Sequence, residues 1–143
     1  MKNTLKVITA ASLLALAQGA SADCTATTAK GVWGFSYDAT DLQGQRSCVG
    51  VGYMTFNTGT FSNNSIKISA QRESCNGSLA KTYAASGTYT VTAACVGKST
   101  NLKYSSNDSG AKLDFNLVQV GTRLQFILVL SNGITMHGEA FKL

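Results

Sequence analysis

Two neighbouring segments near the C-terminus alternate apolar and polar residues with the period of a β-strand. In residues 112–120 leucine or phenylalanine occupies positions 113, 115 and 117, and in residues 123–131 it occupies positions 124, 126, 128 and 130. Each segment therefore has one apolar face and one face toward solvent. Asn132-Gly133 follows the second segment, and this dipeptide is a strong signal for a tight hairpin turn. These segments therefore predict antiparallel strands joined by short turns, each strand with one buried face.

The preceding residues continue this organisation with short β-prone runs between glycine, asparagine, serine and aspartate, and no window keeps a helical period. We expect about eight strands, at residues 31–38, 48–56, 65–71, 82 or 87 to 92, 99–105, 112–120, 123–131 and 134–143.

The predicted fold is an all-β, single antiparallel up-and-down barrel, because about eight amphipathic strands in sequence can close without exposed edges. A β-sandwich is the competing architecture, and the absence of proline suits both. A transmembrane barrel is disfavoured, because its strands need to be longer and to carry aromatic girdles. A barrel of this size is about wide enough for its own side chains or one small ligand.

The N-terminus has the three parts of a secretory signal peptide: a basic start, an apolar run over residues 7–16, and the small residues Ala20-Ser21-Ala22. Cleavage after Ala22 would separate a signal peptide, residues 1–22, from a β-barrel domain, residues 23–143. The apolar run is too short and too interrupted to span a membrane. We therefore expect an exported protein, periplasmic or secreted.

Four cysteines lie beyond the predicted cleavage site, at Cys24, Cys48, Cys75 and Cys95. An even number in an exported protein predicts two disulfides. A hairpin centred near residues 57–60 favours Cys48 with Cys75, which leaves Cys24 with Cys95, although the other two connectivities stay open. Zinc sites use short C-x-x-C pairs or neighbouring histidines, and these cysteines are widely spaced, so we expect no metal and no cofactor.

Positive charge is dispersed along the sequence. The net charge is +5, but the basic residues after the signal peptide stand singly between Lys30 and Lys142. A nucleic-acid site needs a concentrated basic face, so no nucleic-acid partner is expected.

The run Gly-Val-Trp-Gly-Phe-Ser at residues 31–36 resembles the opening strand of a group of small exported bacterial proteins of uncharacterised function. Residues 87–97 are similar to two central motifs of that group, G-T-Y-T-V and D-C-T-G, although Ala94 and Val96 replace an acid and a threonine. With residues 49–56 and 136–140, the resemblance covers nearly all of the domain. This resemblance implies export and a lipocalin-like or allene-oxide-cyclase-like barrel. It does not imply any particular activity.

Gly31-Val32-Trp33 also resembles the lipocalin G-x-W motif. In lipocalins this tryptophan closes one end of the barrel beneath an arginine from a late strand, and Arg123 is the counterpart that the resemblance suggests. The remaining lipocalin motifs are absent.

Six aromatic residues are candidates for lining an apolar ligand pocket, because small ligands are usually held in concave aromatic cavities with a few polar groups. The alternative is that the same side chains fill the core. These candidates are Trp33, Tyr37, Tyr53, Tyr89, Phe115 and Phe126.

His137 and Glu139 lie two apart on the last predicted strand and so share a face, which would place a general base beside a carboxylate. A solvent-facing polar pair is the favoured interpretation, because no serine or cysteine can be assigned as a nucleophile. We therefore assign no catalytic residue.

These features favour an exported binding protein that holds a small apolar ligand in its interior or a macromolecular partner at its loops. A structural or inhibitory envelope protein with a filled barrel is the first alternative. A cyclase or isomerase is the second. The sequence leaves the ligand and the oligomeric state open.

Overall fold

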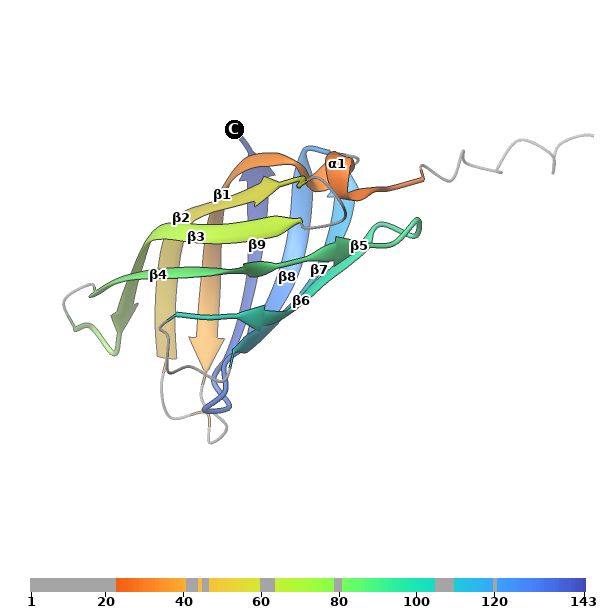
Figure 1. Ribbon diagram of the computed structural model, residues 1–143. Helices are drawn as coiled ribbons and strands as arrows, with labels where there is room; N and C mark the ends of the chain where they lie inside the picture. Colours follow the sequence, from red (N-terminus) through yellow and green to blue (C-terminus); the bar gives the residue numbers. More distant parts are fainter. Residues whose placement is uncertain are drawn as a thin grey trace, which may run out of the picture.

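The computed structural model describes residues 23–40, 44, 47–59, 64–78, 81–104, 110–119 and 121–143. The predicted signal peptide lies outside the described residues. Nine antiparallel strands form one sheet in the order β4-β3-β2-β1-β9-β8-β7-β6-β5, and the sheet curls round on itself (Figure 1). The elements are α1 (Ala26–Ala29), β1 (Gly31–Thr40), β2 (Ser47–Asn57), β3 (Ser65–Cys75), β4 (Lys81–Thr88), β5 (Thr90–Val91), β6 (Val96–Leu102), β7 (Ala111–Gln119), β8 (Arg123–Val129) and β9 (Thr135–Lys142).

The two ends of the sheet belong to one continuous segment, because only Tyr89 separates β4 from β5. β4 pairs with β3, whereas β5 pairs with β6. Ser86 on β4 and Lys103, which directly follows β6, form a bridge between the two ends of the sheet and exchange two backbone hydrogen bonds, of 3.0 and 2.9 Å. The predicted up-and-down barrel is therefore confirmed, and one predicted strand is divided into β4 and β5.

The short helix α1 was not expected from the sequence. Thr25 caps it through a capping box, and the indole Nε1 of Trp33 donates a hydrogen bond of 2.8 Å to the carbonyl of Ala29. A helix of four residues is too short to show a helical period. It packs over one end of the barrel (Figure 1).

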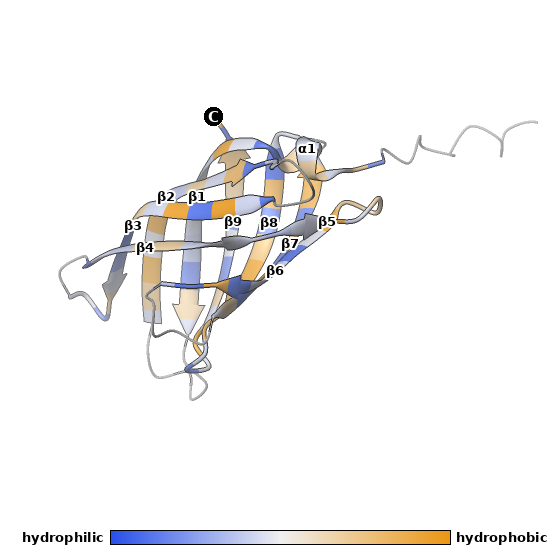
Figure 2. Cartoon of the chain, viewed as in Figure 1, coloured by the Kyte–Doolittle hydropathy of each residue, from blue (hydrophilic) through white to orange (hydrophobic). Residues whose placement is uncertain are grey.

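Most of the interior is apolar, as the alternating residues of the strands predict. Along β1, for example, Trp33, Phe35, Tyr37 and Ala39 are buried and their neighbours Ser36 and Asp38 are exposed. Figure 2 shows this alternation as hydrophobic and hydrophilic bands along several strands. Among the described residues, no helix is long and apolar enough to cross a membrane.

Glycines on the inner face allow aromatic rings to lie flat against neighbouring strands. Four glycines each stand directly across from an aromatic residue, in the pairs Tyr37–Gly50, Phe35–Gly52, Phe115–Gly97 and Phe126–Gly138. A Cβ at any of these glycines would lie within 2.7 Å of the partner ring. The rings thus occupy the space that side chains at these positions would need, an arrangement used to stabilise curved sheets.

Both disulfides predicted from the sequence are present. Cys48 and Cys75 stand opposite one another on β2 and β3, and Cys24 joins Cys95 in the turn between β5 and β6. The second bond fastens the segment before α1 to the end of the barrel. Two disulfides are typical of proteins from oxidising compartments.

Candidate functional site

Five of the six aromatic candidates lie inside the barrel. Trp33, Tyr37, Tyr89, Phe115 and Phe126 are at most 6% exposed, whereas Tyr53 points outward and is 48% exposed. The inner rings pack against one another, with Phe56 lying 4.9 Å from Tyr89 and 5.1 Å from Phe115 between ring centroids. The structure therefore brings five of them together as packing and leaves Tyr53 on the outer surface.

An interior void of about 10 Å³ lies among apolar residues of β1, β2, β3, β7, β8 and β9, with Tyr37 and Gln71 on its boundary. A void of this size holds about one water molecule. A drug-sized ligand needs a cavity of roughly 300 Å³ or more, so an interior ligand would require side chains to move.

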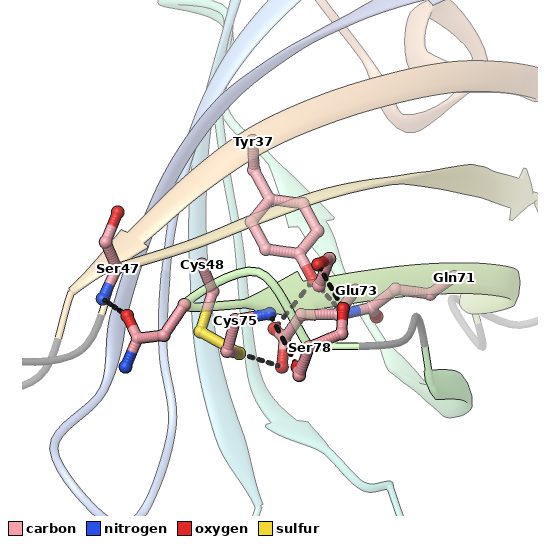
Figure 3. Close-up of a disulfide and its surroundings, with 9 residues drawn as sticks. Tyr37, Ser47, Cys48, Gln71, Glu73, Cys75 and Ser78 are labelled. Atoms are coloured by element: carbon pink, nitrogen blue, oxygen red, sulfur yellow. Dashed lines mark hydrogen bonds between the residues drawn. A yellow bond between two sulfur atoms is a disulfide. The ribbon is translucent and has the colours of Figure 1, made fainter.

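Four polar side chains meet inside the barrel beside this void, and we call them the interior polar network. Tyr37 donates to Glu73 Oε2 at 2.8 Å, and Gln71 Nε2 donates to Tyr37 Oη at 2.8 Å (Figure 3). The Tyr104 hydroxyl donates to Gln71 Oε1 at 3.1 Å. Burial is the main reason that the pKa of Tyr37 lies well above its ordinary range. The hydrogen bond from Gln71 lowers this pKa, and the hydrogen bond to Glu73 and the charge of Glu73 raise it.

The sequence did not reveal Gln71 and Glu73 as interior residues, because a bulge changes the alternation of β3. Ile66 and Ile68 point inward, and simple alternation would continue with residues 70, 72 and 74. Ala70 instead has a φ of 49°, and the register shifts between Ile68 and Gln71. Gln71 and Glu73 therefore turn into the barrel.

A broad depression of about 1030 Å³ lies on the outward faces of β1, β2, β7, β8 and β9 and is bordered by β3 and β6, and we call it the outer depression. Four polar residues form a square in it. Asp38 stands opposite His137, and Ser36 stands opposite Glu139 two residues along. Side chains directly opposite on neighbouring strands have Cβ atoms about 5 Å apart. The square combines two carboxylates, an imidazole and a hydroxyl on one exposed surface.

Apolar side chains flank this square on both sides. Val49 and Val51 of β2 stand opposite Asp38 and Ser36, and Ile127 of β8 stands opposite His137. The three are 55%, 56% and 43% exposed. Large apolar side chains clustered on an exposed surface are a feature of interaction sites, and sequence reasoning did not single these residues out.

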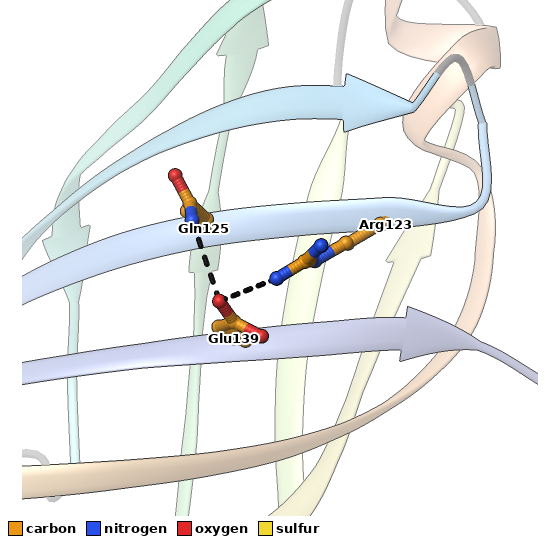
Figure 4. A network of polar contacts seen from close by, with 3 residues as sticks. All are labelled: Arg123, Gln125 and Glu139. Atoms are coloured by element: carbon orange, nitrogen blue, oxygen red, sulfur yellow. Dashed lines mark hydrogen bonds and ion pairs between the residues drawn. The ribbon is translucent and has the colours of Figure 1, made fainter.

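Glu139 is held by neighbours on β8. Arg123 Nη2 lies 2.7 Å from Glu139 Oε1 and forms an ion pair with it, and Gln125 Nε2 donates to the same oxygen at 3.3 Å (Figure 4). The hydrogen bonds from Arg123 and Gln125 lower the pKa of Glu139. A carboxylate stabilised in this way is a weak proton acceptor, which fits the interpretation of His137 and Glu139 as a surface polar pair.

No family model and no curated protein matches this sequence. Several solved structures match, and two redesigned β-barrels are among them. A redesigned β-barrel, b11L5F_LGL, has a TM-score of 0.56 at 18% identity and covers 82% of this protein and 94% of its own length. A redesigned β-barrel called mFAP1, bound to DFHBI, has a TM-score of 0.54 at 17% identity, with coverage of 82% and 97%. These likenesses show the barrel fold, whereas membership of the exported bacterial group stays a prediction.

The predicted partnership of Trp33 with Arg123 is wrong. Arg123 faces outward, where it pairs with Glu139 and lies 5.6 Å from the ring centroid of Phe141. The cation over Trp33 is Lys142, whose Nζ lies 5.6 Å from the ring centroid. The reason is register: Trp33 stands opposite Lys142 on β9, and Arg123 belongs to the next strand, β8.

Proposed function

We propose that this protein is an exported binding protein that holds a partner polypeptide on the outside of its barrel, in the outer depression. The observation that carries the proposal is that the outer side of the sheet offers far more room for a ligand than the inner side. The outer depression has a volume of about 1030 Å³, and the interior void has about 10 Å³. Export is supported by the signal-peptide pattern and by the two disulfides.

The residues of the outer depression indicate what kind of peptide fits. Val49, Val51 and Ile127 offer exposed apolar contacts. The charged side chains of the lining are three carboxylates, those of Asp38, Asp114 and Glu139, and the guanidinium of Arg72. Without Lys2 and Lys6 of the predicted signal peptide, 10 basic and 7 acidic residues give the exported protein a net charge of +3. In the lining of the depression, by contrast, carboxylates outnumber the one guanidinium. A segment with apolar side chains and a lysine or arginine among them complements this surface in both respects.

The test is an NMR titration of isotope-labelled protein with short synthetic peptides that combine valine, leucine or phenylalanine with lysine. We expect shifts in the amides of β1, β2, β8 and β9 around the outer depression. Ile127→Asp should weaken binding by about tenfold or more, because burial of an isoleucine side chain is worth about 1.5–3 kcal/mol. Val118→Asp is the matched control, since Val118 is also exposed but lies on β7 outside the depression's lining.

The proposal would be contradicted if none of the peptides shifts an amide signal. It would also be contradicted if the shifts are the same in Ile127→Asp as in the native protein. Shifts confined to residues around the interior polar network would instead place the ligand inside the barrel.

A small ligand inside the barrel is the second candidate. Two observations favour it: the related fold of the redesigned barrel bound to DFHBI, and the interior polar network, whose hydroxyl and amide groups lie beside an apolar void. Fluorescence titration with DFHBI tests it directly. Because the interior is filled, we expect no saturable signal from the native protein; a saturable signal that Tyr37→Phe weakens would favour this candidate.

A further inference from the structure

Three metal-binding side chains converge at one end of the barrel interior. Cys48 on β2 and Cys75 on β3 stand opposite one another, and Glu73 lies two residues before Cys75 on the same strand. One ligand atom from each of the three residues lies within 4.8 Å of the others. All three are buried or partly buried, and Glu73 is 9% exposed.

We propose that the Cys48–Cys75 disulfide is the oxidised state of a zinc site, and that reduction converts the two sulfurs and the Glu73 carboxylate into its ligands. This inference is independent of the proposed function, because it concerns the opposite face of the sheet. In the oxidised protein each sulfur is bonded to the other, so neither is a thiolate that can bind a metal.

The chemistry balances with a dithiol or phosphine as the reductant. The S–S bond takes up two electrons and two protons and gives two thiols, while a dithiol becomes a disulfide or a phosphine becomes its oxide with oxygen from water. Zn²⁺ then displaces the two thiol protons into solvent. The metal holds two thiolates and one carboxylate, and water takes the fourth position of a tetrahedron.

The interior polar network already orients the carboxylate for this role. Tyr37 holds Oε2 of Glu73 at 2.8 Å, whereas Oε1 lies 3.3 Å from Cys75 Sγ (Figure 3). Gln71 in turn holds the Tyr37 hydroxyl, and Tyr104 holds Gln71. Outer hydrogen bonds of this kind fix the direction of a ligand and raise metal affinity.

Gly50 makes this arrangement possible. It stands opposite both Tyr37 and Glu73, and a Cβ at this position would lie 2.2 Å from the Tyr37 ring. The tyrosine can therefore lie across β2 and reach Glu73. Two thiolates favour a soft or borderline ion such as Zn²⁺ over Mg²⁺ or Ca²⁺.

The experiment uses Co²⁺ as a coloured substitute for Zn²⁺. The protein is reduced with a phosphine, desalted without oxygen and titrated with Co²⁺ while its absorption spectrum is recorded. We expect a thiolate-to-cobalt charge-transfer band that saturates at one ion per molecule and that excess Zn²⁺ abolishes. The oxidised protein should give no band.

Variants locate the site. Cys48→Ser with Cys75→Ser should abolish the band, and Glu73→Gln should weaken Co²⁺ binding by about tenfold or more. Cys24→Ser with Cys95→Ser is the matched control for the sulfurs, and Glu139→Gln on the outer surface is the control for the carboxylate. Both controls should keep the band.

Circular dichroism of the reduced protein keeps the proposal falsifiable if reduction loosens the fold. A reduced protein that regains its β-sheet spectrum on adding Zn²⁺ would support the site, since metal binding then contributes folding free energy. A reduced protein without a cobalt band, a band that depends on Cys24 and Cys95, or a reduced protein that stays unfolded with Zn²⁺ would overturn it.

Discussion

A single added methyl group at Gly97 tests whether glycine–aromatic pairs determine the packing of the barrel. An alanine Cβ there would lie 2.1 Å from Cζ of Phe115, which stands directly opposite on β7. The ring is 2% exposed and packs against Phe56 and Tyr89, so it has little room to turn away. Overpacking costs about 1–3 kcal/mol, and we expect Gly97→Ala near the upper end, a fall in Tm of about 10 °C.

A double-mutant cycle separates the ring clash from other effects of the new methyl group. Phe115→Leu alone should destabilise by about 1–2 kcal/mol, because it leaves unfilled space in the core. Combined with Gly97→Ala it should cost less than the sum, with a coupling of about 1 kcal/mol or more. The assay is equilibrium unfolding in urea, followed by the fluorescence of Trp33.

Gly34→Ala is the matched control, because the nearest atom to its added Cβ is a Leu143 methyl at 3.6 Å, an ordinary contact. Its free energy of unfolding should change by less than about 0.5 kcal/mol. Costs for Gly97→Ala and Phe115→Leu that simply add, or a neutral Gly97→Ala, would refute the reasoning.

Two further predictions concern pH and the disulfides. Burial raises the pKa of Tyr89 to about 12 from 10.0. Because Tyr89 ionises first in the unfolded state, its contribution to stability is intact below pH 10 and is lost as the pH rises from 10 to about 12. Tyr89→Phe should therefore reduce the fall in unfolding free energy over this pH range, measured by unfolding in urea. In the loop-entropy treatment, the disulfides Cys24–Cys95 and Cys48–Cys75, with separations of 71 and 27 residues, contribute about 4.4 and about 3.6 kcal/mol. Replacing the first pair by alanine should therefore lower the unfolding free energy more than replacing the second, and the reverse order would show that strain or residual structure dominates.

The strands were predictable because their inner faces alternate. Leucine or phenylalanine occupies every second position over residues 113–117 and 124–130, and β7 and β8 are found there. The hairpin between β2 and β3 followed from turn residues near 57–60, and it places Cys48 opposite Cys75. Each of these features depends on neighbours in sequence, so the residue pattern alone could predict it.

The candidate sites were harder to predict, because they depend on register between strands. The bulge at Ala70 turns Gln71 and Glu73 inward. No residue type in this segment indicates a bulge. The meeting of Asp38 with His137 depends on the pairing of the first strand with the last, which only barrel closure provides. The sequence placed His137 and Glu139 on one face, but the neighbours Ser36 and Asp38 lie about a hundred residues away in the sequence.

The filled interior and the outer depression have a common origin in the glycine–aromatic pairs. Tyr37, Phe115 and Phe126 fill the barrel by lying against Gly50, Gly97 and Gly138, and all of these except Gly97 also border the outer depression. Small residues at such positions let a sheet bend strongly, and a sheet that bends around packed rings closes its interior while shaping its outer surface. A barrel built this way has little space for an interior ligand, and its binding chemistry is available on the outside. The Gly97→Ala cycle and the peptide titration therefore test two consequences of one arrangement.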